Sequence, residues 1–156
     1  MAREIKPALT YAQNQAIEGV NNQAAERDVD QVMDFIENFI QTYTDYFEDG
    51  KINLFAVEAH PNLRQKEAQV AFVLINLTGE TISELNAELQ LEVEDFGVSF
   101  EAMDWTIPSE FLGNWEDGYA ILVVDNVKMT GSPTQMAYGI GEISLEVGEI
   151  TVRHPR

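Results

Sequence analysis

Aromatic and acidic side chains are mixed in residues 104–119, which read DWTIPSEFLGNWEDGY. Two carboxylates beside sugar-stacking rings are the machinery of glycoside hydrolases, whereas exposed aromatic side chains without such a pair bind sugars or proteins and cleave nothing. The chain holds 27 acidic residues, so acids near aromatic rings are expected by chance, and we predict no catalysis. We predict instead a binding patch made of Trp105, Phe111, Trp115 and Tyr119. The alternative is that both tryptophans fill the core while the acids face water.

Other residues that could do chemistry are few. The chain has no cysteine, which removes thiolate ligands and nucleophiles, and its two histidines, His60 and His154, each precede a proline. No G-x-S-x-G motif accompanies them, so a Ser-His-Asp triad is not indicated. Asp45, Glu48 and Asp49 lie close together but lack the alternation of an EF-hand calcium loop. We therefore expect no catalytic residue, no cofactor and no metal site, and we predict that the protein is not an enzyme.

Charge is the most unusual property of the composition. Nine Lys and Arg stand against 27 Asp and Glu, for a net charge of −18. Phosphate backbones and anionic membranes select basic surfaces, so we expect no direct binding to nucleic acid. Acidic surfaces keep proteins apart in solution, which accounts for the charge without a function. The same charge suits an acidic decoy that imitates DNA and occupies the basic groove of a nucleic-acid-binding protein.

Two apolar runs are predicted to form the centre of the fold that positions these residues. Residues 70–77 are apolar almost throughout, as in a strand covered on both faces. Residues 85–94 alternate between apolar and polar side chains, as in a strand with one buried face. A polar connection that contains Gly79 joins the two runs. This order predicts antiparallel pairing of residues 67–77 with residues 84–95.

Further strands are predicted on both sides of this pair. The first spans residues 52–59, where His60-Pro61-Asn62 ends it, and others span residues 98–103 and 119–129. In residues 136–152 the alternation changes phase across Gly148, which indicates a bulge or a bend. About seven strands separated by turn signals are typical of an antiparallel immunoglobulin-like β-sandwich. We predict a mainly β fold with this sandwich in residues 50–156.

Residues 1–49 are predicted to form an N-terminal α-helical segment, with the helical part in residues 8–49 packed on or beside the sandwich. Residues 8–20 are compatible with a helix, and we expect a break near residues 19–22. Apolar residues three and four apart then recur over residues 29–48, which predicts the main helix.

The ends and the packing of this main helix can also be predicted. Asp28 is the expected N-cap, and Gly50 is the expected left-handed residue after the C-terminus. The apolar stripe spans fewer than three heptads and is rich in Phe and Tyr, which is short for an autonomous coiled coil. We therefore expect it to pack on the chain's own sandwich, and a homodimer through the helical segment is the alternative.

The residues that join the two central strands carry a resemblance to a known family. Asn76-Leu77-Thr78-Gly79 ends one apolar strand, and Ile82 precedes the strand that begins near Leu85. This order resembles the opening of bacterial immunoglobulin-like modules, including surface-layer-assembly (SLAP) type domains, over about residues 52–125. The resemblance implies an immunoglobulin-like fold and a role in adhesion, assembly or binding. Such modules usually belong to exported proteins, and the long N-terminal helix and the lack of a signal depart from that pattern.

The patterns together predict a non-catalytic protein–protein interaction or binding module with an unidentified protein partner. The alternatives are the acidic decoy and, second, a carbohydrate-binding module. The N-terminus lacks the basic-then-apolar layout of a secretory signal, and no run approaches 18 apolar residues. We therefore expect a cytoplasmic protein with no membrane span, or a cell-surface protein if a signal had been trimmed from the sequence.

Overall fold

The computed structural model describes residues 4–18, 23–62, 64–95 and 97–155, and the break expected near residues 19–22 lies outside them. In this part of the chain the fold is mainly β, with nine strands and three α-helices. In chain order the elements are β1 (Lys6–Pro7), α1 (Tyr11–Glu18), α2 (Gln23–Tyr43), η1 (Thr44–Tyr46), β2 (Ile52–Asn62), β3 (Glu67–Asn76), β4 (Glu84–Val93), β5 (Val98–Phe100), β6 (Met103–Ile107), α3 (Ser109–Leu112), β7 (Tyr119–Gly131), β8 (Tyr138–Gly139), η2 (Ile140–Glu142) and β9 (Ile143–Arg153).

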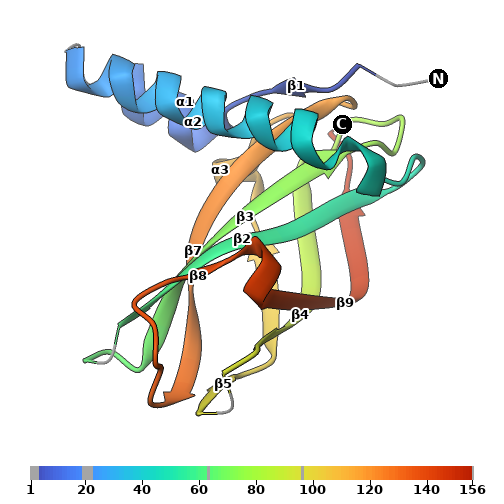
Figure 1. The fold of residues 1–156 in the computed structure, drawn as a ribbon. Coiled ribbons are helices and arrows are strands. Elements are labelled where there is room, and N and C mark those ends of the chain that lie inside the picture. The colour runs from blue at the N-terminus through green and yellow to red at the C-terminus, as the bar shows by residue number, and fades with distance from the viewer. Residues whose placement is uncertain (1–3, 19–22, 63, 96, 156) are drawn as a thin grey trace.

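The strands form two sheets that curl together as a half-barrel (Figure 1). The large, six-stranded sheet has the order β1-β7-β3-β2-β8, with β5 also paired to β7, and the small sheet has the order β6-β4-β9. β1 pairs in parallel with β7, and every other ladder between described strands is antiparallel. The predicted mainly β fold with two sheets is confirmed, but the pairing is mixed rather than wholly antiparallel.

Two apolar clusters divide the molecule into three layers. The first cluster lies between the sheets, where Phe72 of β3 and Leu89 of β4 are buried. The second lies on the other face of the large sheet, where Ile36 and Phe39 of α2 pack with Val73 of β3. Figure 1 shows α2 lying across β7, β3 and β2, whose side chains belong to this second cluster. The prediction that the helical stripe packs on the chain's own sheet is therefore confirmed.

The ends of the main helix differ from the prediction. α2 begins at Gln23, so Asp28 lies inside the helix and does not cap it, and the α-helix ends at Tyr43 before the 3-10 turn η1. Gly50 has the expected left-handed φ of 84°, but it lies in the turn that leads into β2. The predicted boundary between residues 49 and 50 falls in this turn, and the second cluster joins residues on both sides of it.

The prediction that the two central strands pair with each other is wrong. β3 pairs with β2 and β7 in the large sheet, whereas β4 pairs with β6 and β9 in the small sheet. The two strands face each other across the core, because Val70, Phe72 and Leu74 point toward the same cluster as Leu85 and Leu89. The alternating pattern of residues 85–94 requires one buried face, and packing against a second sheet buries that face without pairing to β3.

Two details of the edge strands bear on the candidate site. β2 continues through His60 and Pro61 to Asn62, so these residues do not end the strand as predicted. β9 is one strand, and its ladder with β4 passes from Ala87↔Ile150 to Leu89↔Val147, which places one extra residue on β9. The bulge predicted at Gly148 is thereby confirmed.

Candidate functional site

The two tryptophans of the predicted aromatic patch lie in the core. Trp105 and Trp115 are each 3% exposed. The Trp105 ring lies 4.6 Å from the Phe72 ring, and its indole N–H donates to Asp125 Oδ2 at 2.9 Å. The Trp115 indole N–H donates to the carbonyl oxygen of Tyr119, also at 2.9 Å. Neither ring presents a face to solvent, so the expectation that they form an exposed stacking surface is corrected.

Phe111 and Tyr119, the other two members, are half-buried against the same cluster. Phe111 lies on the short helix α3, and Tyr119 begins β7. Tyr119, Trp115 and Leu112 line a small hollow of about 120 Å³. The two tryptophans fill the core and the other two rings pack against it, which agrees with the alternative that the sequence left open.

The residues that carry the family resemblance also have structural roles. The fully buried Asn76 side chain donates from Nδ2 to the carbonyl oxygens of Glu80, at 2.8 Å, and Trp115, at 3.0 Å. Its Oδ1 accepts hydrogen bonds from the backbone N–H and the hydroxyl of Thr78, at 3.0 and 2.7 Å. Ile82 is buried beyond this turn and forms a bridge with Trp115. Asn76 therefore fixes the crossing from the large sheet to the small one.

The structure also contains an open seam between the two sheets, which we define as the space between residues 52–57 of β2 and β9. On its outer side β2 pairs only with β8, through Glu58 and Ala59, so residues 52–57 have no ladder there. β9 pairs with β4 on one side, and no described strand pairs with its other side. Among the described strands no backbone ladder closes the half-barrel at this seam, although β2 and β9 lie in contact there.

Most of the apolar side chains on the core side of β9 are less buried than their cross-strand partners on β4. Leu89, on β4, is 2% exposed, whereas its cross-strand partner Val147 is 37% exposed although it belongs to the same inward phase. The rest of the β9 row is only half-buried: Ile143, Leu145, Ile150 and Val152. Apolar surface on the core side of β9 is thus left exposed at the seam.

The seam contains a hollow of about 560 Å³. Leu54 of β2 and Ile150 and Val152 of β9 give it apolar walls. Tyr46, from the turn after α2, is 71% exposed and stands at its rim. Tyr46 and Val147 are two of the few large apolar side chains that are exposed in the described part of the chain, and both line this hollow.

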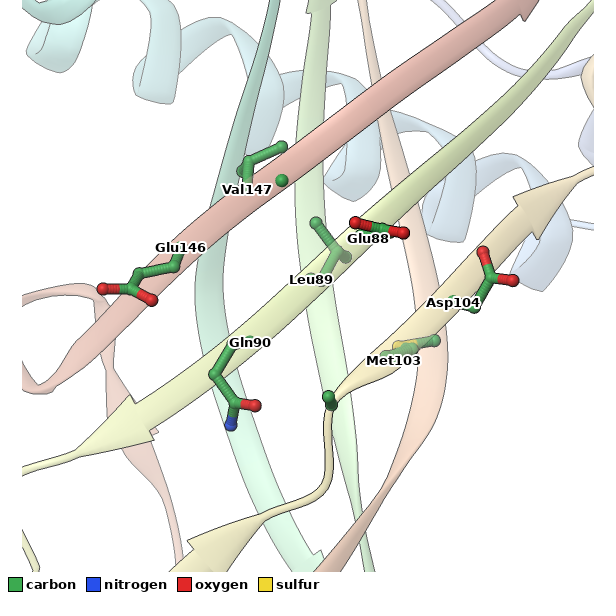
Figure 2. Close-up of a pocket in the computed structure, with 9 residues that line it drawn as sticks. Glu88, Leu89, Gln90, Met103, Asp104, Glu146 and Val147 are labelled. Atoms are coloured by element: carbon green, nitrogen blue, oxygen red, sulfur yellow. The ribbon is translucent and has the colours of Figure 1, made fainter.

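A second hollow, of about 620 Å³, lies over the small sheet on the other side of β9 (Figure 2). Val147 and Gly148 line both hollows, so β9 forms the ridge between them. Figure 2 shows Glu88 on β4 and Asp104 on the adjacent β6, with Glu146 on β9 on the opposite flank of β4. Glu88 and Asp104 are direct cross-strand partners, a pairing of like charges that costs stability.

Gly148 allows β9 to lie close to the Glu88 side chain of β4. A β-carbon at this position would lie 3.2 Å from the Glu88 Cβ and 3.0 Å from its Oε2. A larger residue would push β9 away from β4 at the bulge. Glycine at this position thus keeps the edge of β9 beside the Glu88 side chain.

Charges near the seam are mostly negative. In the described residues no ion pair reaches Glu88, Asp104 or Glu146. The cations nearby are already occupied, because Lys51 pairs with Glu48 and the Arg153 guanidinium lies 3.1 Å from Glu84. The surface on both sides of β9 therefore attracts positive charge.

A hydrogen-bonded clasp holds the chain that leads into β9. The Asp95 carboxylate accepts the Tyr138 hydroxyl at 2.7 Å, the Thr134 N–H and hydroxyl at 2.8 Å each, and the Gly97 N–H at 3.0 Å. These donors, Tyr138 foremost, hold the pKa of the Asp95 carboxyl well below its usual range. Burial, and then the bond to Asp95, raises the pKa of Tyr138. The clasp fixes residues 132–139 and hence the start of β9.

The histidines do not gather a metal site. His60 Nε2 lies 2.8 Å from Glu58, and His154 Nε2 lies 3.3 Å from Glu80. No group of three or more metal-ligating side chains occurs among the described residues. Of the helices in residues 4–18, 23–62, 64–95 and 97–155, none has both the length and the apolar content needed to cross a membrane.

Comparison with known proteins gives no match to any family model, to any curated protein or to any solved structure. The function of the site therefore has to be inferred from its geometry. Of the four aromatic residues suggested by the sequence, Trp105 and Trp115 lie in the core, and no predicted site residue lies at the seam. Its one sequence signal was the change of phase across Gly148, which marks an edge strand that departs from regular pairing.

Proposed function

We propose that this protein is a non-catalytic binding module that takes up an extended segment of a partner protein at the open seam. The observation that carries the proposal is the uncovered apolar row of β9 opposite the unpaired edge of β2. An extended segment can pair its backbone with such an edge while alternate side chains enter apolar pockets. A segment seated on β9 would cover Val147 and the half-buried positions beside it.

The geometry of the seam also supports an extended segment over a small ligand. The hollow is an open groove between two strands, and residues 52–57 of β2 span about 20 Å at ~3.3 Å per residue. Strand edges with free donors and acceptors recruit other strands. A peptide in β conformation supplies both the backbone groups and the alternating side chains that this groove lacks.

An immunoglobulin-like relationship belongs to the same proposal. Two sheets packed across an apolar core, and a buried asparagine turn between them, support it. The mixed pairing and the open seam separate the fold from a regular sandwich. We also propose a cytoplasmic location for this binding module. The carbohydrate-binding alternative loses its stacking surface because both tryptophans are buried.

The test uses a pool of blocked seven-residue peptides with alternating apolar and polar positions, in basic, neutral and acidic versions. Backbone amide shifts of the labelled protein are recorded by NMR during titration with each version. We expect at least one version to shift amides of β9 and of residues 52–57 while the outer edge of β6, the matched free edge of the small sheet, stays unchanged. Val147→Asp should remove these shifts. Shifts confined to other surfaces, or no shifts with any version, overturn the proposal.

The acidic decoy is a second candidate, favoured by the carboxylates over the small sheet. Glu88, Asp104 and Glu146 surround the hollow of Figure 2 without cationic partners among the described residues. A basic groove on a nucleic-acid-binding protein would meet this face, and its affinity would fall steeply with salt. A decoy predicts that Glu88→Gln with Asp104→Asn weakens binding more than Val147→Asp does. The seam predicts the opposite order.

A further inference from the structure

The free charge at the edge of β9 is acidic. Glu146 is exposed just before the bulge and Glu149 is exposed within it, and neither has an ion pair in the described chain. The cations beside the seam, Lys51 and Arg153, already pair with Glu48 and Glu84. A segment that pairs with β9 on its open side therefore meets uncompensated negative charge.

The same charge acts against pairing between two copies of this chain. A two-fold pairing of β9 with β9 of a second copy would bring Glu146 and Glu149 of both copies to one junction. Like charges directly opposite each other destabilise a ladder, and each copy also carries a net charge of −18. Edge strands commonly use charges and bulges to prevent such self-association, and β9 has both.

We propose, on the basis of the proposed function of the seam, that its occupant is a basic segment of another protein and that a second copy of this chain is excluded. The segment carries apolar side chains at alternate positions. These cover Val147, Ile150 and Leu54 in the seam. The positions between them carry Lys or Arg, which face Glu146 and Glu149 on the outer side.

The experiment compares three blocked peptides of seven residues that differ only in the polar positions: Lys-Val, Thr-Val and Glu-Val alternation. Affinity is measured by titration calorimetry at low and at high salt, and the binding site is read from backbone amide shifts. We expect the Lys peptide to bind at β9 at least tenfold more tightly than the Glu peptide at low salt, with the Thr peptide between them.

A pair of double variants separates local charge from total charge. Glu146→Gln with Glu149→Gln should weaken the Lys peptide about fivefold and leave the Thr peptide unchanged. Asp30→Asn with Glu37→Gln removes the same number of charges from exposed positions on α2 and should leave both affinities unchanged. All variants keep the apolar row intact, so folding is expected to be preserved.

The outcomes distinguish this inference from the function on which it rests. Equal affinity of all three peptides at β9 overturns the basic-partner inference but leaves the seam as a binding site. Equal weakening by the two double variants shows that only total charge matters, which also overturns it. If none of the three peptides binds at the seam, both proposals are overturned. In sedimentation, an unaltered chain that stays monomeric while its Glu146→Gln, Glu149→Gln double variant dimerises supports exclusion of a second copy. A stable dimer of the unaltered chain refutes it.

Discussion

Leu89 and Val147 are cross-strand partners on the same inward side of the small sheet, and truncating each to alanine tests whether the seam is open. Leu89 is 2% exposed, so Leu89→Ala should cost about 3 kcal/mol, within the range for buried leucines. Val147→Ala removes two methyl groups that are roughly two-thirds buried, which at ~0.8 kcal/mol per buried group gives about 1 kcal/mol. Leu89→Ala also removes one more carbon than Val147→Ala, so only the part of the difference beyond ~0.8 kcal/mol measures the missing cover.

The assay is equilibrium unfolding in urea, followed by fluorescence and circular dichroism at two protein concentrations. Equal slopes for the two variants are required, so that the shift in midpoint reports stability. A cost for Val147→Ala that equals the cost for Leu89→Ala would mean that Val147 is covered in solution, and the open seam would be refuted. If a seam-binding peptide is added at saturation, the cost of Val147→Ala should rise, because the side chain then becomes buried.

Three further predictions concern residues outside the seam. Asn76→Ala removes four hydrogen bonds of a fully buried side chain and should cost about 3 kcal/mol in urea unfolding. The lowered pKa of Asp95 means that its contribution to stability is present above the usual aspartate pKa and is lost as the pH falls below it. Asp95→Asn should therefore lose less stability than the native chain between about pH 5 and about pH 2. Because Trp105 and Trp115 are buried, their fluorescence should be blue-shifted and resist acrylamide quenching until unfolding.

Each of these predictions has an outcome that contradicts it. A cost below about 1 kcal/mol for Asn76→Ala would mean that the crossing between the sheets does not depend on this side chain. Parallel acid profiles for the native chain and Asp95→Asn would show that the clasp with Tyr138 does not form. Efficient quenching in the folded protein would place at least one tryptophan at the surface and restore the aromatic patch.

Strand positions could be predicted from the sequence because local patterning determines them. The alternation in residues 85–94 and the apolar run from Val70 gave β4 and β3 nearly to their ends, and the change of phase at Gly148 gave the bulge. Pairing could not be predicted in this way. An alternating strand has the same pattern whether it pairs with the preceding strand in one sheet or packs against it from a second sheet. The crossing held by Asn76 places β4 in the second sheet.

The candidate site was harder to predict because it is defined by strand edges that have no neighbouring strand. An aromatic stretch looks the same whether its rings fill a core or cover a surface, and Trp105 and Trp115 turn out to fill the core. The seam depends on which strands lack a neighbour, and that is a property of topology. Val147 reads as an ordinary core valine in the sequence, and only the position of β2 shows that it is left partly exposed.

The position of β9 in the chain also has a consequence for how the protein is made. Its ladder with β4 joins Val93 to Ile143 and Glu84 to Arg153, so this edge of β4 waits through about fifty further residues of synthesis before β9 begins, long after β6 has been made for the other edge. Ladders between such distant segments form slowly, and an unpaired strand is prone to aggregate while it waits. Glu88 and Glu92 are exposed on β4, and charges at such positions discourage association of strands. We therefore expect the acidity of the small sheet to limit aggregation during synthesis, before any partner is met.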